Sequence, residues 1–287
     1  MDLVFYTYFY GSNNNPAFYI PDIQTLKYKC YYFTNNLDML NKLQFTKWIP
    51  VYDDKPISDD LINSCMTGKD VKVLPHIYNE LKDHDYVCYL DNKLHRLNIT
   101  FIEQYITTYF INNNYALLVR VHQFVHDNIW NEYNESMLQE RYRIQSNTYK
   151  QYIYKQIENG LSETTPTHCT CNFLIRNMKH EQINNINNTW RTHIQECGIQ
   201  DQISFFFVKQ LFDKYIFPFT ESQYIDNIVH VRPPNLKTFP EFLHKPSVEH
   251  VPTVHHPPTP LNTPRDLQHP PLNNHININN ITKIVFR

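Results

Sequence analysis

The sequence predicts an α/β protein built around a mostly parallel sheet. Short runs of β-favouring apolar residues alternate along the chain with longer amphipathic segments, a pattern typical of a parallel sheet that helices cover on both faces. The run at 86–90 is apolar throughout, as expected for a strand that is buried on both faces. With 287 residues, the chain is long enough for one large domain and an appendage.

The individual elements follow from local composition and period. The first strand is expected at 3–10, where a β-favouring run ends in the turn-forming residues 11–16. Further β-favouring runs predict strands at 30–34, 48–52, 86–90, 116–121 and 172–175. Apolar residues that recur on one side of a helix predict helices at 100–111, 127–144 and 149–157, and a helix-like run follows at 202–215.

The composition changes at Arg232-Pro233-Pro234. From there to about residue 271 the chain is dense in Pro and His, so it cannot build a packed core. The stretch 276–286 alternates apolar and polar residues well enough to add a strand to its own subunit or to another. We therefore expect a domain at 1–231 and an extended arm at 232–287, through which a homo-oligomer could form. The arm's histidines could bind metal, or the arm could be a solvated linker.

Charge and hydropathy exclude several classes of partner. The formal net charge is −2 and the pI is near 6.7, so neither a nucleic acid nor a membrane surface is expected as a partner. No apolar stretch approaches the ~20 residues needed to span a bilayer, and residues 1–6 lack the basic region of a signal peptide. We expect a cytoplasmic protein with reduced thiols. The excess of Asn, Ile, Tyr and Phe indicates an AT-rich genome such as that of a large DNA virus, in which case the cytoplasm is that of a host cell.

A zinc site is a further hypothesis for residues 168–180. Cys169 and Cys171, with His168 and His180, are metal-ligating residue types, but no second correctly spaced pair completes a closed tetrahedral site. Structural zinc is therefore not expected.

A carboxylate follows the predicted strand at 86–90. In open α/β sheets, ligands bind beyond the carboxyl ends of the strands, so Asp91 would point into a ligand cleft. A carboxylate there can hold Mg²⁺ or Mn²⁺ against a diphosphate, because hard oxygen ligands suit these cations. Alternatively, Asp91 and Asn92 only close a turn after the buried strand.

Several motifs occur in a specific order. They are Lys72-x-x-Pro75-His76, the strand ending Leu90-Asp91-Asn92-Lys93, His122 with Glu132 ten residues on, Asn172 to Arg176, Trp190, and Asp201-Gln202-x-Ser204-Phe205. This order resembles the glycosyltransferase-like family that includes plant mucilage-related hexosyltransferases, over roughly residues 3–212. The resemblance implies a GT-A fold, a Rossmann-like α/β sandwich. It also implies transfer of a hexose from a nucleoside diphosphate sugar to a glycan or protein acceptor, assisted by Mn²⁺ or Mg²⁺, with a UDP-sugar preferred over a GDP-sugar.

The resemblance also implies roles for particular residues. Those expected to bind the donor are Thr7, Gly11, Thr34, Asn35, Lys72, His76, Lys93 and Arg176, and the expected metal ligands are Asp91 and His230. On the acceptor side the expected catalytic residues are Asp201, Gln202, His122 and Glu132. Simpler alternatives stay open: Asp201 could cap a helix, Glu132 could be an exposed helix carboxylate, and His230 could be a half-buried strand residue. Arg176 could pair with a neighbouring carboxylate instead of a phosphate.

Three departures from the family pattern bear on activity. Asn35-Asn36 replaces an acidic pair, Gln200 stands where the family has Arg, and Asn92 stands where it has Gly. Losing the Arg removes a planar cation that could hold a phosphate bidentately. A noncatalytic module that binds a sugar nucleotide or a glycan is therefore the alternative function. A structural protein that assembles through its arm is a third.

Overall fold

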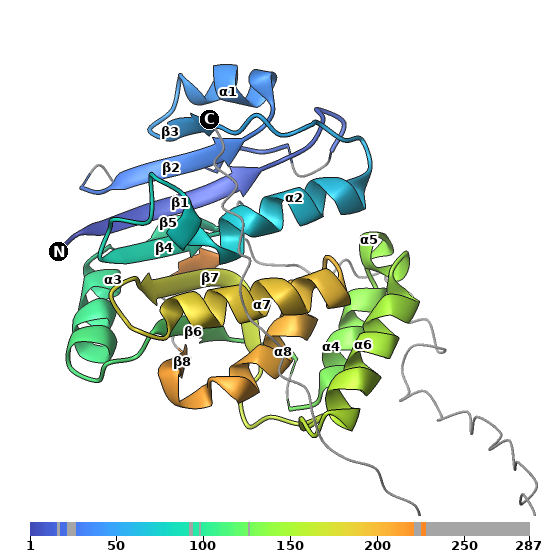
Figure 1. Ribbon diagram of the computed structural model, residues 1–287. Coiled ribbons are helices and arrows are strands. Elements are labelled where there is room, and N and C mark those ends of the chain that lie inside the picture. Colours follow the sequence, from blue (N-terminus) through green and yellow to red (C-terminus); the bar gives the residue numbers. More distant parts are fainter. Residues whose placement is uncertain are drawn as a thin grey trace, which may run out of the picture. The chain divides into compact units, whose positions relative to one another are not determined.

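The computed structural model describes residues 1–15, 18–21, 27–91, 94–97, 99–125, 127–220 and 225–227, with backbone only at 94–97 and 225–227. These residues form a mixed α/β domain (Figure 1). The expected boundary at 231/232, the arm and the strand at 276–286 lie outside the described residues, so they stay predictions, as does association through the arm. Within the described part of the chain, no helix is both long and apolar enough to span a bilayer.

A seven-stranded sheet forms the centre of the domain. In spatial order its strands are β3 (Ile49–Tyr52), β2 (Lys29–Thr34), β1 (Leu3–Phe9), β4 (Tyr86–Leu90), β7 (Cys169–Asn177), β6 (Leu117–Val121) and β8 (Ile216–Phe219). Every strand runs parallel to the others except β7, which is antiparallel to both neighbours. The predicted α/β class with a mostly parallel sheet is thus confirmed. A second, two-stranded sheet pairs β5 (Leu94–Leu97) with β9 (Ile225–Asn227).

Helices connect most of the strands. They are α1 (Leu37–Leu43), α2 (Leu61–Val73), α3 (Ile99–Tyr105), α4 (Ile129–Met137), α5 (Glu140–Arg143), α6 (Ser146–Glu158), α7 (Ile183–Cys197) and α8 (Asp201–Leu211). Shorter turns are η1 (Pro75–Ile77), η2 (Ile106–Ile111, a π-helix) and η3 (Asp213–Tyr215). The single helix expected at 127–144 is divided between α4 and α5, because Gln139 has an extended backbone (φ −103°, ψ 122°). Strand β7 is longer than the expected 172–175 because it pairs along both of its edges.

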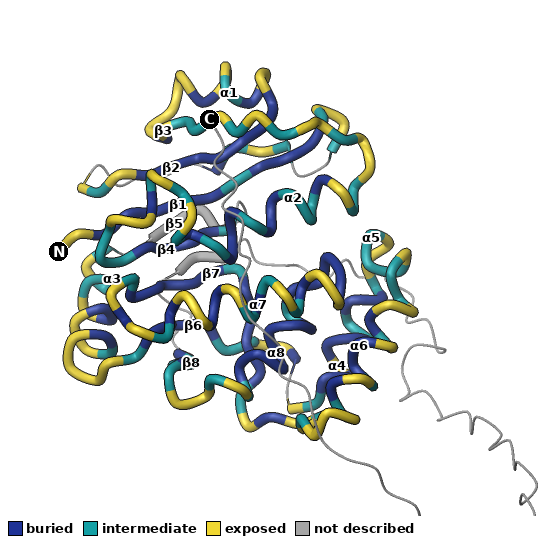
Figure 2. The backbone as a smooth tube through the Cα atoms, in the orientation of Figure 1, coloured by how far each residue is buried: buried dark blue, intermediate teal, exposed yellow. Residues whose placement is uncertain are grey.

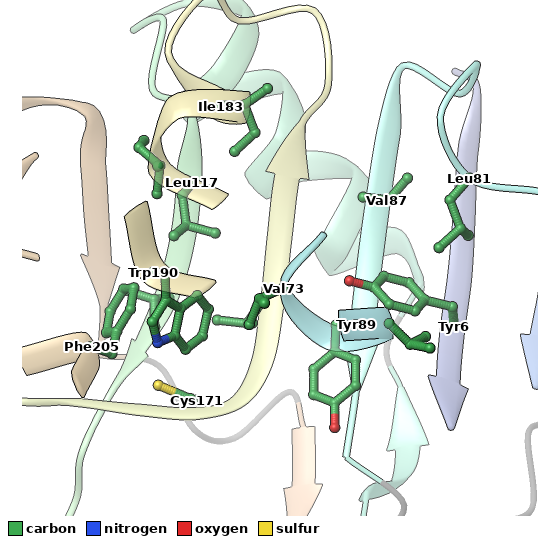
Figure 3. Close-up of a cluster of buried hydrophobic side chains, with 14 of the residues drawn as sticks. Tyr6, Val73, Leu81, Val87, Tyr89, Leu117, Cys171, Ile183, Trp190 and Phe205 are labelled. Carbon is green, nitrogen blue, oxygen red and sulfur yellow. The ribbon is translucent and has the colours of Figure 1, made fainter. Parts of the chain in front are cut away.

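Both faces of the sheet are buried, each by its own set of helices. Successive strand residues point to opposite faces. Tyr6 of β1 accordingly joins the core under α2, α7 and α8, while Phe5 joins the core under α1, α3 and η2. In the first core, Trp190 lies against Phe205 with ring centroids 4.6 Å apart (Figure 3). The strands β1, β2, β4, β6 and β7 are buried along most of their length (Figure 2), which explains their near-continuous apolar sequences.

A third core forms away from the sheet. Side chains of α4, α6 and α8 build it, with Trp130, Tyr149 and Phe207 among its buried members. Helix α8 belongs to two cores, because Phe205 faces the sheet whereas Phe206 and Phe207 face α4 and α6. The position of α8 is therefore fixed from two sides.

The strand order defines one place where a ligand is expected. From β1 the chain continues to β2 and β3 on one side and then returns to β4 on the other. Strands β1 and β4 therefore flank the point where the strand order reverses, and open α/β sheets bind ligands beyond the carboxyl ends of their strands at such a point. Gly11 and Asp91 follow these two strands.

Gly68 permits the close approach of α2 to the sheet. A Cβ atom at this position would lie 2.2 Å from Cε2 of Tyr8 on β1. We predict that Gly68→Ala lowers the free energy of unfolding: overpacking costs about 1–3 kcal/mol, against a gain of about 1 kcal/mol in helix propensity. Urea denaturation measures the difference. Thr67→Ala, the neighbouring substitution in α2, should not destabilise the protein. A Gly68→Ala protein more stable than wild type would contradict this packing.

Candidate functional site

Two lysines from α2 converge on one carboxylate beside the switch point. Nζ of Lys69 lies 2.7 Å, and Nζ of Lys72 lies 2.6 Å, from the same Oδ2 of Asp201. Lys69 and Lys72 are three residues apart and so share a face of α2, and Asp201 is the first residue of α8. All three side chains are buried. We call this group the lysine–aspartate cluster.

The charge state of Asp201 follows from these contacts. Burial by itself would raise the pKa of the Asp201 carboxyl, but the charges and hydrogen bonds of Lys69 and Lys72 outweigh burial and lower the pKa to about 2. A carboxylate with so low a pKa is a weak proton acceptor near neutral pH. The geometry therefore favours a positioning role for Asp201, and its expected role as a catalytic base stays a prediction.

Asp91 adjoins this cluster through an aromatic ring. Nζ of Lys72 lies 4.9 Å from the centroid of the Tyr89 ring, and the hydroxyl of Tyr89 donates to Oδ1 of Asp91 at 3.2 Å. The backbone N–H of Asp91 donates to the carbonyl of Asn172 at 2.8 Å, which fixes the residue just beyond β4. Asp91 is partly exposed. A carboxylate and two ammonium groups thus lie at the same edge of the sheet.

A divalent cation at this edge would need ligands from outside the described side chains. Among the described residues, no group of three or more His, Cys, Asp or Glu side chains could hold a metal. The expected ligand His230 lies outside the described part of the chain. Mg²⁺, however, is commonly bound by one or two carboxylates with phosphate oxygens and water, so the partly exposed Asp91 fits that kind of site.

A second polar cluster surrounds Glu132. Its Oε2 lies 2.8 Å from Nε2 of His168. Its Oε1 accepts hydrogen bonds from Nε2 of Gln200 and Nε2 of Gln202, both at 2.9 Å, and from the hydroxyl of Ser136 at 3.3 Å. We call this group the glutamate cluster. Its carboxylate is buried and fully engaged, in contrast to the exposed helix carboxylate that the sequence also allowed.

His122 lies at the edge of the glutamate cluster. Its ring stacks on that of His168 with centroids 5.5 Å apart. Its Nδ1 accepts the backbone N–H groups of Phe124 at 3.1 Å and Val125 at 2.9 Å. With both bonds accepted at Nδ1, the proton of a neutral His122 ring would lie on Nε2.

The first turn of α8 joins the two clusters. Asp201 turns toward the lysines of α2, while its neighbours Gln200 and Gln202 bind Glu132 of α4. The structure therefore brings together six of the residues that the resemblance implies, in one region at the carboxyl ends of β4 and β6. They are Lys72, Asp91, Asp201, Gln202, His122 and Glu132.

Asn35 fixes the loop that follows β1. Its Oδ1 accepts the N–H of Gly11 at 3.1 Å, and its Nδ2 donates to the carbonyls of Lys55 at 3.2 Å and Pro56 at 3.0 Å. Asn36 also donates to the carbonyl of Gly11, at 2.9 Å. Gly11 has φ +126°, and a Cβ there would lie 2.9 Å from Oγ of Ser64. The amide pair and this glycine thus shape the loop at the switch point.

Four of the expected donor-binding residues lie elsewhere. Thr7 and Thr34 belong, by strand alternation, to the face opposite Tyr6 and Phe33, where the hydroxyl of Thr34 accepts the N–H of Asn36. Arg176 pairs with Val87 near the start of β4, and His76 follows the end of α2. Lys93, a fifth, lies outside the described residues.

Arg176 is fully buried with three neutral partners. It donates to Oδ1 of Asn187 at 3.0 Å, to the hydroxyl of Tyr6 at 2.9 Å and to the carbonyl of Lys72 at 3.0 Å. These bonds connect β7 to α7, β1 and α2. The geometry therefore favours a role for Arg176 in positioning Lys72, and not in contacting a phosphate. Donor binding by Arg176 and His76 stays a prediction.

Sequence reasoning missed Lys69, and it considered His168 only as a zinc ligand. The spacing of Lys69 and Lys72 on one helical face was an available signal, but α2 itself was not predicted. Cys169 and Cys171, two of the other three residues considered for zinc, lie in the apolar core under α2, α7 and α8.

No family model and no curated protein matches this chain. Mouse xyloside xylosyltransferase 1, in its apo form, resembles it in structure with 11% identity and a TM-score of 0.41, over 76% of this chain and 84% of that one. An active-site mutant of LgtC has 14% identity and a TM-score of 0.39, over 76% and 72%. CMP:2-keto-3-deoxy-manno-octonic acid synthetase, complexed with CTP, has 11% identity and a TM-score of 0.40, over 76% and 88%. TM-scores this low carry no argument about this chain's activity, and membership of the mucilage-related family stays a prediction.

The bonds of Asn35 require an amide. We predict that Asn35→Asp lowers the free energy of unfolding by about 2 kcal/mol, because a carboxylate cannot donate to the carbonyls of Lys55 and Pro56 and leaves them unsatisfied. Urea denaturation at pH 7 measures the loss. Asn184→Asp, an exposed substitution of the same chemistry in α7, is the control. If the free energy of unfolding falls equally little in both variants, the bonds of Asn35 do not stabilise the loop that follows β1.

Asp201→Asn tests the lysine–aspartate cluster. The substitution leaves two buried ammonium groups without a counter-charge, so we expect a loss of about 3 kcal/mol at pH 7. The pKa of Asp201 is lowered in the folded state, so its contribution is full above pH 3.8 and disappears as the pH falls toward about 2. The stability difference between wild type and variant should therefore shrink over that range.

Glu196→Gln provides the control for this measurement. Glu196 pairs with Lys155 at 2.7 Å, and both side chains are exposed, at 42% and 56%, so the pair contributes about 1 kcal/mol or less. Urea titrations at pH 7, 5 and 3 compare the variants. A loss of unfolding free energy in Asp201→Asn that is no larger than in Glu196→Gln, or that does not depend on pH, would refute the role given to Asp201.

Proposed function

We propose that this protein is a glycosyltransferase of the GT-A type, which binds a nucleoside diphosphate sugar and transfers its hexose to a glycan or protein acceptor. One observation carries the proposal: Lys69 and Lys72 converge on Asp201 next to Asp91, at the edge where the strand order reverses. A site for a diphosphate needs cations, and this edge is where an α/β sheet binds its ligand.

On the donor side, the lysines would stabilise the diphosphate leaving group. As the bond between the anomeric carbon and the diphosphate breaks, negative charge grows on the departing oxygen, and a fixed ammonium group lowers the energy of that state. Lys72 is the better candidate for direct contact, since it also lies over the ring of Tyr89, next to Asp91. Asp201 would hold both lysines in place, and Asn35 would shape the donor loop through Gly11.

Asp91 is proposed as the metal ligand on the described part of the chain. A bound Mn²⁺ or Mg²⁺ would neutralise part of the diphosphate charge, with phosphate oxygens and water completing its coordination. A UDP-sugar is the first donor to test and a GDP-sugar the second.

The glutamate cluster would form the acceptor side. Glu132 holds the amide of Gln202, whose Oε1 in turn accepts the hydroxyl of Thr170 at 3.3 Å. Gln202 and His122 are both partly exposed, so both could bind hydroxyl groups of an acceptor. The acceptor hydroxyl would attack the anomeric carbon as its bond to the diphosphate breaks, and the hydroxyl proton would pass to the departing diphosphate oxygen.

The contacts of Gln200 matter for the alternative function, a noncatalytic binding module. Its Nε2 donates to Glu132 at 2.9 Å and to the hydroxyl of Ser136 at 2.7 Å, inside the glutamate cluster and not toward the lysines. Gln200 is thus accounted for by bonds within the fold, and its presence does not favour a noncatalytic module.

Ligand-dependent thermal stabilisation tests the proposal. We expect UDP or GDP to raise the melting temperature of the full chain, because a ligand at about 100 times its Kd adds about 2.7 kcal/mol. Mn²⁺ should increase the effect. Asp91→Asn should remove the metal-dependent part, whereas Asp83→Asn, an exposed substitution before the start of β4, should retain it.

Release of nucleoside diphosphate from UDP- and GDP-sugars, with a panel of glycan and peptide acceptors, tests turnover. Release that depends on an acceptor supports the enzyme. Binding without turnover across the panel would support the module that only binds. Absence of stabilisation by every nucleoside diphosphate would contradict both.

A further inference from the structure

Arg141 lies in the short helix α5, which is anchored on both sides to the loop before Asp201. On one side, Ser136 at the end of α4 accepts Nε2 of Gln200 at 2.7 Å. On the other, Oε1 of Gln145 accepts the backbone N–H of Ile199 at 3.0 Å. A Cβ on Gly198 would lie only 2.6 Å from that same Oε1, which shows how closely the segments approach. Helix α5 is therefore held beside the start of α8.

The guanidinium of Arg141 is incompletely satisfied in this position. Its Nε is buried, and no hydrogen-bond partner reaches it among the described residues. Its guanidinium carbon lies 4.5 Å from the centroid of the neighbouring Tyr142 ring, a contact that stacks the cation but leaves this N–H unpaired. A buried donor without a partner costs about 1–3 kcal/mol, and such a group calls for an explanation.

The charges around Arg141 belong to the proposed donor site. Burial would lower the pKa of its guanidinium, but the electrostatic influence of Tyr142, Cys65, Asp91 and Asp201 raises it. Burial raises the pKa of Tyr142, and the charges of Asp201 and Asp91 raise it further. Arg141 thus faces the same region as the lysine–aspartate cluster. Among the described residues, three cations there, Lys69, Lys72 and Arg141, face two carboxylates, Asp91 and Asp201.

We propose that Arg141 is a phosphate-binding residue, which holds the diphosphate of the donor and of the leaving nucleoside diphosphate. A diphosphate supplies acceptor oxygens to the partly exposed Arg141 side chain, and a guanidinium can bind phosphate through two parallel N–H groups. It also supplies the negative charge that this region needs for balance. Lys69 and Lys72 are already paired with Asp201, whereas Nε of Arg141 has no partner among the described residues. The inference rests on the proposed nucleotide-sugar site.

Calorimetry with UDP and GDP, without and with Mn²⁺, tests this assignment on the full chain. Arg141→Gln should weaken binding of the nucleoside diphosphate about 10- to 100-fold, the range expected for losing a hydrogen bond between charged groups. Arg141→Lys should weaken it less, because a point charge remains while the planar fork is lost. Binding of the uncharged nucleoside, uridine or guanosine, should change by less than about twofold in both variants.

Two further measurements distinguish a wrong assignment of Arg141 from a wrong proposed function. Arg143→Gln removes an equal charge from the same helix and should leave the affinity for nucleoside diphosphate within about twofold. Thermal melting without ligand should show that Arg141→Gln is folded; if it is not, Arg141→Lys carries the comparison. Wild-type protein that binds UDP or GDP, together with a folded Arg141 variant of equal affinity, would overturn the inference and leave the proposed function intact. Wild-type protein that binds neither would overturn the proposed function itself.

Discussion

The ionic bond between α2 and α8 determines the arrangement of the proposed site. Removing charges from water is costly, and a buried ion pair recovers that cost only with good geometry and further hydrogen bonds. Asp201 meets this condition with two ammonium groups, at 2.7 and 2.6 Å from one oxygen. Because the carboxylate begins α8 and both lysines lie on one face of α2, the contact fixes the relative position of two helices that cover the same face of the sheet. The cations are therefore held in place before any ligand arrives.

The buried side chain of Arg176 stabilises the backbone at Lys72. Arg176 binds the carbonyl of Lys72, the residue whose ammonium group reaches Asp201. Its other partners, Tyr6 and Asn187, come from the sheet and from α7. The backbone and the side-chain end of Lys72 are thus fixed by different partners. Such support reduces the rotamer freedom that a long side chain would otherwise lose on binding a ligand.

The fold was predictable from local patterns, whereas the site was predictable only in part. The strand before Asp91 is apolar and ends abruptly, so both the strand and the position of the carboxylate at its end follow from the sequence. The partnership of Lys69 with Asp201 joins residues 132 positions apart, and no local pattern contains such information. Asn35 shows the same limit: the resemblance implied a donor-binding residue, but no local pattern indicated its bonds to Gly11, Lys55 and Pro56. Arg141 was missed because its environment is built by α2, β4 and α8, all distant in sequence.

The reversed direction of β7 has a consequence for how this protein can change over evolution. Because β6 and β7 are antiparallel neighbours, the segment between them leaves and re-enters the sheet at one edge, where the N–H of His122 donates to the carbonyl of His168 at 2.8 Å. Segments with adjacent ends are tolerant of insertion and replacement, and this one contributes two helices, α4 and α6, to the third core, which they share with α8. Glu132 and Arg141 belong to this segment, while Lys69 and Lys72 belong to α2 and Asp91 follows β4. A replaced segment would therefore alter the proposed acceptor side together with Arg141, while Lys69, Lys72 and Asp91 would stay in place.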